Sequence, residues 1–154
     1  MARAARRIAL MVLAAWLVTV APPKTQAQSR QSVWDGVYTD AQAERGRGQY
    51  AQHCAVCHGT ALEGNGESPP LVGQFIPDWA GTTLADLDDK IQNTMPLNAP
   101  GTLRPAIAAD ILAYILKANS FPSGQNELDA APGSLGRIAF EVKPKPAASR
   151  QDKR

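Results

Sequence analysis

The chain has 154 residues, which is enough for one domain with its own core and hardly enough for two. Its formal net charge is +2, but residues 28–136 carry 6 basic and 12 acidic side chains, whereas residues 137–154 carry 6 and 2. The body is therefore acidic and the end basic, which argues against nucleic acid as a partner of the fold.

The first 27 residues have the order of a secretory signal. "MARAARR" carries three arginines, residues 8–21 form an apolar run without charge, and small residues surround a cleavage point after Ala27. The run has 14 residues, fewer than the roughly 20 that a helix needs to cross a bilayer. We expect residues 1–27 to be removed and the protein exported to the periplasm. An uncleaved signal would instead anchor it to the membrane.

A first helix is predicted after a lead-in segment at residues 28–37. "TDAQ" at 39–42 has the form of a capping box, with Thr39 as the N-cap and the Gln42 side chain reaching back to it, and a helix should follow to about His53. Gly46 and Gly48 lie inside this helix, where each costs about 1 kcal/mol relative to alanine. Gly46 indicates either a second helix that crosses closely or a weak, bent helix.

Two further helices follow a long loop. Residues 59–82 are rich in Gly and Pro and predict a loop of 24 residues. Thr83 marks the start of a second helix, which ends at "MPLNAPG" (95–101). From Pro105, an apolar stripe predicts a third helix to about Asn119. Three helices with so long a loop form a poor core, so a large apolar group is expected in addition.

The segment after the third helix contains little that could form a core. Residues 121–154 are therefore expected to be an extended, disordered, basic tail. Such a tail is either simply solvated or steers docking onto an acidic partner or an anionic surface.

Both cysteines and both histidines lie in "HCAVCHG" at residues 53–59. C-x-x-C-H is typical of c-type haem attachment, so Cys54 and Cys57 are expected to hold one haem c covalently and His58 to bind its iron. A redox dithiol would need a preceding strand and a βαβ context. A zinc site would draw its ligands from separate segments, so both alternatives fit less well.

Met95 is the candidate for the sixth ligand of the iron. It is the only methionine after residue 27, and Pro96 biases it toward an extended backbone outside the helix. The ordinary role of a lone methionine is to fill a gap in a core. His53 lies beside the attachment site and cannot easily reach the opposite face, and Lys90 is the one credible substitute.

Residues 38–120 resemble a small bacterial class I c-type cytochrome. The resemblance rests on the order of "CAVCHG", "PPLVG", "FIPDW", "TLADL", "MPLNAPGTL" and "DILAYIL". It implies an all-α, class I cytochrome c fold in which three main helices and long loops surround one covalently attached haem. The match leaves out residues 28–37 and 121–154, and Arg104 stands where the family often has a capping serine.

The resemblance also implies roles for single residues. The carbonyl of Pro69 would accept a hydrogen bond from His58 Nδ1–H, and Leu71 would pack on the haem. Trp79 would either donate its indole N–H toward a haem propionate or pack in the core. The first and last helices would cross at three matching positions: Gly46, Tyr50 and Tyr114.

Histidine–methionine ligation saturates the iron and raises its potential, which favours electron transfer over catalysis. We expect a protein that is not itself an enzyme and carries single electrons between a periplasmic dehydrogenase and a terminal oxidase or other cytochrome. It would do so as a soluble carrier or as the cytochrome subunit of an oxidoreductase complex. Relatives with a segment like "VWDGVYTDAQAERG" often accompany quinoprotein-type dehydrogenases, which favours that donor. The alternatives are a haem enzyme and a gas or redox sensor with a displaceable Met95.

Overall fold

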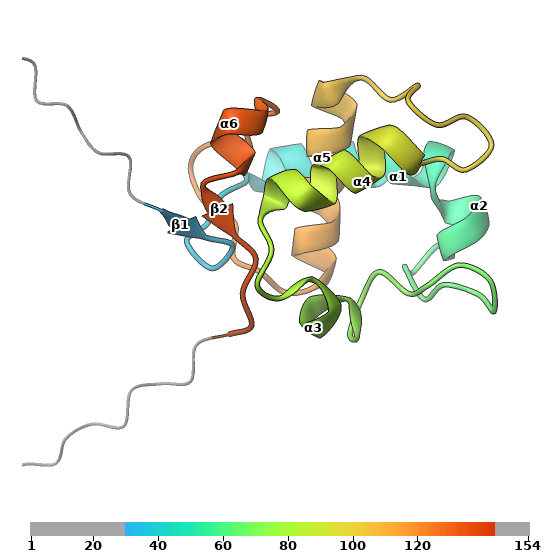
Figure 1. Cartoon of the computed structure of the whole chain (residues 1–154), viewed down its shortest axis with the longest axis horizontal. Coiled ribbons are helices and arrows are strands. Elements are labelled where there is room, and N and C mark those ends of the chain that lie inside the picture. The colour runs from blue at the N-terminus through green and yellow to red at the C-terminus, as the bar shows by residue number, and fades with distance from the viewer. Residues whose placement is uncertain (1–29, 144–154) are drawn as a thin grey trace, which may run out of the picture.

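The computed structural model describes residues 30–143 of the chain, so the signal predicted at residues 1–27 lies outside the described residues. Its elements, in chain order, are β1 (Gln31–Ser32), α1 (Asp40–His53), α2 (Ala55–His58), α3 (Phe75–Trp79), α4 (Leu84–Thr94), α5 (Pro105–Ala118), α6 (Pro132–Leu135) and β2 (Ile138–Ala139). The three predicted helices are confirmed as α1, α4 and α5. Figure 1 shows the two short strands and α6 at the end of the molecule opposite α2.

Helix α1 crosses α5 at Gly46. A Cβ atom on Gly46 would overlap the backbone carbonyl of Asp110 in α5 and would lie 3.0 Å from the Cβ of Tyr114. One turn further on, the buried Tyr50 ring packs against Tyr114 with 5.3 Å between ring centroids. Of the two interpretations of Gly46, the close crossing is therefore correct, and α1 continues through this glycine over 14 residues.

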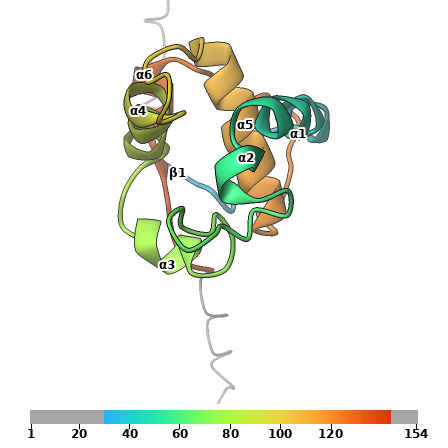
Figure 2. The ribbon, with the colours of Figure 1, turned by 90° about the vertical axis from the view of Figure 1, so that its right-hand side faces the viewer.

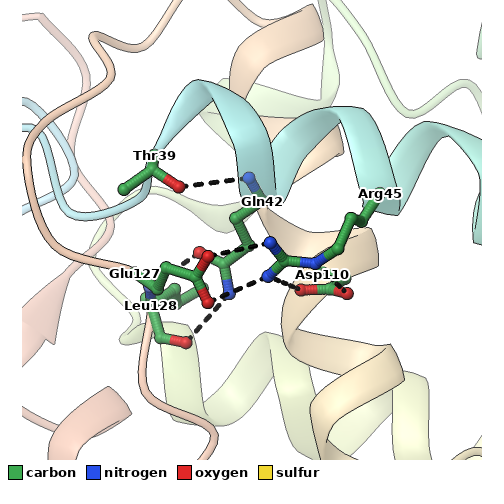
Figure 3. A network of polar contacts seen from close by, with 6 residues as sticks. All are labelled: Thr39, Gln42, Arg45, Asp110, Glu127 and Leu128. Atoms are coloured by element: carbon green, nitrogen blue, oxygen red, sulfur yellow. Dashed lines mark hydrogen bonds and ion pairs between the residues drawn. The ribbon is translucent and has the colours of Figure 1, made fainter.

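Helices α1 and α4 differ in how their N-terminal ends are capped. Thr39 Oγ1 accepts a hydrogen bond from the backbone N–H of Gln42 at 3.1 Å, as predicted. The Gln42 amide does not return to Thr39, because Nε2 donates to the Leu128 carbonyl at 3.0 Å and Oε1 accepts from the Leu128 N–H at 2.7 Å (Figure 3). The complete capping box occurs at α4 instead, between Thr83 and Asp86. The prediction for Gln42 was wrong because a distant backbone segment bonds its amide.

Residues 121–143 are part of the folded body, so the predicted disordered tail is wrong for this stretch. After α6 the chain forms β2, which pairs in parallel with β1 in the lead-in. The pairing places Gln31 beside Ile138. Five large apolar side chains of this segment are buried: Phe121, Leu128, Leu135, Ile138 and Phe140. They were missed because most of them lie too far apart along the segment to show helix or strand periodicity. Residues 144–154 lie outside the described range, and with them most of the basic charge of the predicted tail.

The lead-in completes the same core. Val33 and Val37 are buried, and the Trp34 ring packs on Phe121 with 4.5 Å between centroids. Trp34 Nε1 also donates to the Glu141 carbonyl at 2.9 Å. Residues on both sides of the predicted 38–120 boundary thus join one hydrophobic core with the helices. No helix within residues 30–143 is long and apolar enough to cross a membrane.

An ion-pair network joins α1, α5 and the segment after α5 (Figure 3). The Arg45 guanidinium donates to both carboxylate oxygens of Asp110 at 3.0 and 3.2 Å, and to both of Glu127 at 2.8 and 2.9 Å. These bonds lower the pKa of the Glu127 carboxyl. Pairs this exposed are worth at most about 1 kcal/mol each, so the network orients the segment more than it stabilises it.

Gln42→Ala is expected to lower the free energy of unfolding by about 2–3 kcal/mol. The substitution leaves the buried N–H and C=O of Leu128 without partners, and an unpaired buried polar group costs about 1–3 kcal/mol. Urea denaturation measures the change. Gln52→Ala, at an exposed position of the same helix, is the control and should shift stability by less than about 0.5 kcal/mol. Equal losses in the two variants would contradict this account.

Asp88 is a buried carboxylate in α4, with 4% of its surface exposed. Its Oδ2 accepts a hydrogen bond from Gln92 Nε2, and Oδ1 has no partner within residues 30–143. Burial raises the pKa of Asp88 above its ordinary value of 3.8, although the Gln92 bond lowers it. Because the folded pKa lies above the unfolded one, stability falls as the pH rises from about 3.8 through the folded pKa.

Asp88→Asn is therefore expected to raise the stability at pH 7. An amide is neutral at every pH in this range, so the gain should shrink as the pH falls toward 4. Urea denaturation at both pH values checks the prediction. Asp89→Asn, on the exposed side of the same helix, is the control for removing a charge from α4. A gain that is the same at pH 4 and pH 7 would show that the charge of Asp88 is not its cause.

Candidate functional site

Helix α2 carries the C-x-x-C-H motif. Cys54 is the C-cap of α1 and the N-cap of α2, and the backbone N–H groups of Cys57 and His58 donate to its carbonyl at 3.1 and 2.9 Å. One helical turn thus brings both thiols, which are free, and the imidazole to the same short segment. Burial raises the pKa of the Cys54 thiol to about 11. A redox dithiol needs a thiol with a lowered pKa, so this environment argues against that alternative.

The tautomer of His58 follows from its hydrogen-bond partner. The residue is 8% exposed, and its Nδ1 lies 2.9 Å from the Pro69 carbonyl oxygen. A carbonyl only accepts, so Nδ1 carries a proton, and in the neutral imidazole Nε2 then keeps a lone pair. Neutral imidazole with a free ring nitrogen is the form that binds a metal. The described part of the chain holds no cluster of three or more His, Cys, Asp or Glu side chains that could bind a bare metal ion.

The loop after α2 is closed onto the helix by its own polar groups. Asn65 Nδ2 donates to the Cys57 carbonyl at 3.0 Å, while Oδ1 accepts from the Ser68 N–H at 2.8 Å. Gly64 has a φ of +73°, and a Cβ atom there would lie 2.8 Å from the carbonyl carbon of Pro69. The loop therefore passes close to itself at a position that only glycine suits. This path carries the Pro69 carbonyl to His58.

The loop continues into a series of partly buried apolar side chains. Leu71 donates its N–H to the Leu62 carbonyl at 2.8 Å, and its own carbonyl accepts from Asn119 Nδ2 at 2.8 Å. Four side chains of this region are partly buried against the core: Leu71, Val72, Ile76 and Trp79. The centroids of the Trp79 and Phe75 rings lie 6.1 Å apart. This aromatic contact fits the interpretation that Trp79 packs in the core.

Met95 lies directly after α4. Its backbone is extended (φ −121°, ψ 150°), as predicted from Pro96, and its N–H donates to the Ile91 carbonyl at 3.1 Å. The side chain is half-buried, whereas Lys90 is exposed and His53 is the last residue of α1. Figure 2 shows α4 and α2 on different sides of the molecule, with α3 below them.

These residues fit a covalently attached haem. Two free thiols lie one turn apart, the imidazole presents an unprotonated nitrogen, and a thioether comes from a separate element. Sequence reasoning missed two residues that organise the site, Asn65 and Asn119. Asn65 could have been found from its place in a Gly-rich turn. Asn119 carries no local signal, because its partner lies 48 positions away.

Residues 41–115 match the family model described as cytochrome c oxidase, cbb3-type, subunit III. Among solved structures, the chain is similar to one from the sulfane dehydrogenase SoxCD of Paracoccus pantotrophus, at 18% identity and a TM-score of 0.47. That match covers 73% of this chain and 66% of the other, just under two thirds of its length. No curated protein matches the chain. Residues 41–115 thus form a cytochrome c domain, an electron carrier, and the two cysteines within it, Cys54 and Cys57, are consistent with covalently attached haem c.

Proposed function

We propose that His58 and Met95 are the axial ligands of the haem iron. We propose further that the protein passes single electrons from a periplasmic dehydrogenase, of quinoprotein type, to a terminal oxidase or another cytochrome. The observation that carries the assignment of His58 is the bond between its Nδ1 and the Pro69 carbonyl, because that bond leaves Nε2 available. The haem, when bound, supplies the one-electron chemistry.

The residues around the haem would hold it and limit access to it. The half-buried thioether of Met95 would occupy the sixth position, so that small molecules do not bind there. Leu71 would pack on the ring, and Trp79 would pack there or donate its N–H to a propionate. Pro69 would hold the orientation of His58 and raise its basicity as a ligand.

The exposure of the attachment segment supports electron transfer across a surface contact. Val56, which lies between the two cysteines, is 88% exposed. Leu97, two residues after Met95, is 71% exposed. Electron transfer requires no substrate cavity, only an approach of the partner to the cofactor, and an exposed attachment segment allows that approach. The proposed donor rests on the family resemblance of the segment before the motif.

The experiment uses the full chain produced with its own N-terminus in a bacterium that attaches c-type haem. The periplasmic protein is expected to have the reduced spectrum of a low-spin c-type cytochrome and, when oxidised, the weak far-red band of methionine–iron ligation. It should not bind carbon monoxide readily. A high-spin spectrum with ready carbon monoxide binding would instead support the haem enzyme or sensor.

Intact mass of the same sample tests export and attachment together. The mass should equal that of residues 28–154 plus one haem, because the signal is removed after Ala27 and two thioether bonds add the haem without loss of atoms. If the protein keeps residues 1–27 and is found in the membrane fraction, the uncleaved signal anchors it and the predicted cleavage is wrong. Reduction of the purified protein by quinoprotein and flavoprotein dehydrogenases, compared side by side, tests the donor class.

A further inference from the structure

The buried amide of Asn119 joins the C-terminal end of α5 to the loop after α2. Asn119 is the C-cap of α5 and is 8% exposed. Its Nδ2 donates to the Leu71 carbonyl at 2.8 Å and to the Ile115 carbonyl at 2.9 Å. The second bond stays within the helix, whereas the first reaches a loop that is distant in the sequence.

The end of α5 is capped without this side chain. The backbone N–H groups of residues 119–121 already donate to the carbonyls of Ile115, Leu116 and Lys117 at 3.0–3.1 Å. This is the backbone pattern of a Schellman motif, which satisfies the last carbonyls of a helix. The contribution that only the side chain makes is therefore the bond to Leu71.

The partners of the Asn119 amide determine its orientation. Both partners are carbonyls, which only accept, so the amide nitrogen must face them. Its Oδ1 is buried and has no partner in the part of the chain that the structure describes. A buried acceptor left unpaired is unfavourable, so the side chain acts through its donors and not through its acceptor. An aliphatic or carboxylate side chain could not take its place.

Leu71 is held from both sides. Leu62 fixes its N–H and Asn119 fixes its carbonyl, each at 2.8 Å. Two residues earlier along this short stretch is Pro69, whose carbonyl lies 2.9 Å from His58 Nδ1. A shift of the Leu71 backbone would therefore move the carbonyl that orients the imidazole.

We propose that Asn119 is a positioning residue for the haem. Through the backbone of Leu71, Asn119 holds the Pro69 carbonyl against His58 and thereby sets the reduction potential. The inference rests on the proposed function, because it takes His58 as an iron ligand. A well-aligned bond from Nδ1–H makes the imidazole a stronger electron donor and stabilises oxidised iron. Loosening that bond is therefore expected to raise the potential.

The test compares the haem-loaded proteins with Asn119→Ala, Asn119→Ser and Tyr38→Phe. A serine hydroxyl can still bond the carbonyl four residues earlier, that of Ile115, but is too short to reach Leu71. Asn119→Ser thus keeps the local bond and removes only the distant one, should Asn119→Ala fail to fold. Tyr38→Phe is the matched control, because it removes a buried 2.6 Å bond to the Phe121 carbonyl at the same end of α5.

Both Asn119 variants are expected to show a higher reduction potential than the unmodified protein. In the reduced state, the His58 Nδ1 proton should exchange with solvent about tenfold faster, the factor that corresponds to about 1.4 kcal/mol. Tyr38→Phe should lose stability while both readouts stay unchanged. If Asn119→Ser also loses only stability, Asn119 is a structural residue and the inference is overturned. If the unmodified protein lacks the spectrum of histidine–methionine ligation, the proposed function itself is wrong, and this result does not depend on the variants.

Discussion

Met95→Ala is expected to leave the haem attached and to lower the reduction potential by on the order of 0.2 V. In the proposed ligation, the Met95 thioether would stabilise reduced iron, and its loss would open the sixth position to water or added ligands. The attachment survives because it depends on Cys54 and Cys57. The far-red band of the oxidised protein should disappear, and carbon monoxide should bind readily to the reduced protein.

Spectroelectrochemistry and carbon monoxide titration measure these changes. Leu97→Ala is the matched control, since this exposed side chain lies in the same loop, and its removal should leave spectrum and potential unchanged. If Met95→Ala behaves like Leu97→Ala, Met95 is not a ligand. Lys90→Ala would then test the remaining candidate, and loss of the native spectrum in that variant would assign the sixth position to Lys90.

Gly46→Ala is expected to lower the free energy of unfolding by about 3 kcal/mol. The added methyl group would overlap the carbonyl of Asp110, a backbone atom that cannot turn away as a side chain would. The helices α1 and α5 would have to separate, and overpacking of this kind costs about 1–3 kcal/mol or more. Because Tyr50 and Tyr114 pack at the same crossing, their contact would be lost as well.

Gly48→Ala is the matched control in the same helix. A Cβ atom at Gly48 meets nothing within 4 Å, so the substitution adds only helix propensity and should stabilise the protein by about 0.5–1 kcal/mol. Urea denaturation of the two variants should therefore show shifts of opposite sign. Stabilisation by Gly46→Ala would mean that α1 and α5 do not approach each other as closely as the structure has it.

Local signals were sufficient for the helices. Thr83 marked the start of α4 correctly, where it forms a capping box with Asp86, and Pro105 begins α5 although Arg104 makes no side-chain cap. Pro96 likewise indicated the extended backbone of Met95. Each of these features depends on residues within one helical turn, whose preferences operate before any tertiary contact forms.

Distant contacts decided features that no local pattern could reveal. The Gln42 amide had a local partner in Thr39, but bonds to Leu128 instead, 86 positions away. Phe121 and Phe140 were predicted to be parts of a disordered basic tail, yet their rings meet edge to face in the core with 5.4 Å between centroids. Both outcomes depend on which surfaces the helices leave uncovered after they pack.

The sequence by itself indicated the chemistry of this protein, because two thiols and an imidazole within five residues are typical of covalent haem attachment. It also determined where the main helices begin. Only the tertiary structure decided that Gly46 is a crossing point, that residues 121–143 complete the core, and that Asn119 bonds the Leu71 carbonyl. The physical reason is the separation of the interacting residues along the sequence. Helix capping and haem attachment depend on residues that are close in the sequence, whereas a helix crossing or a buried amide finds its contacts only when distant segments meet.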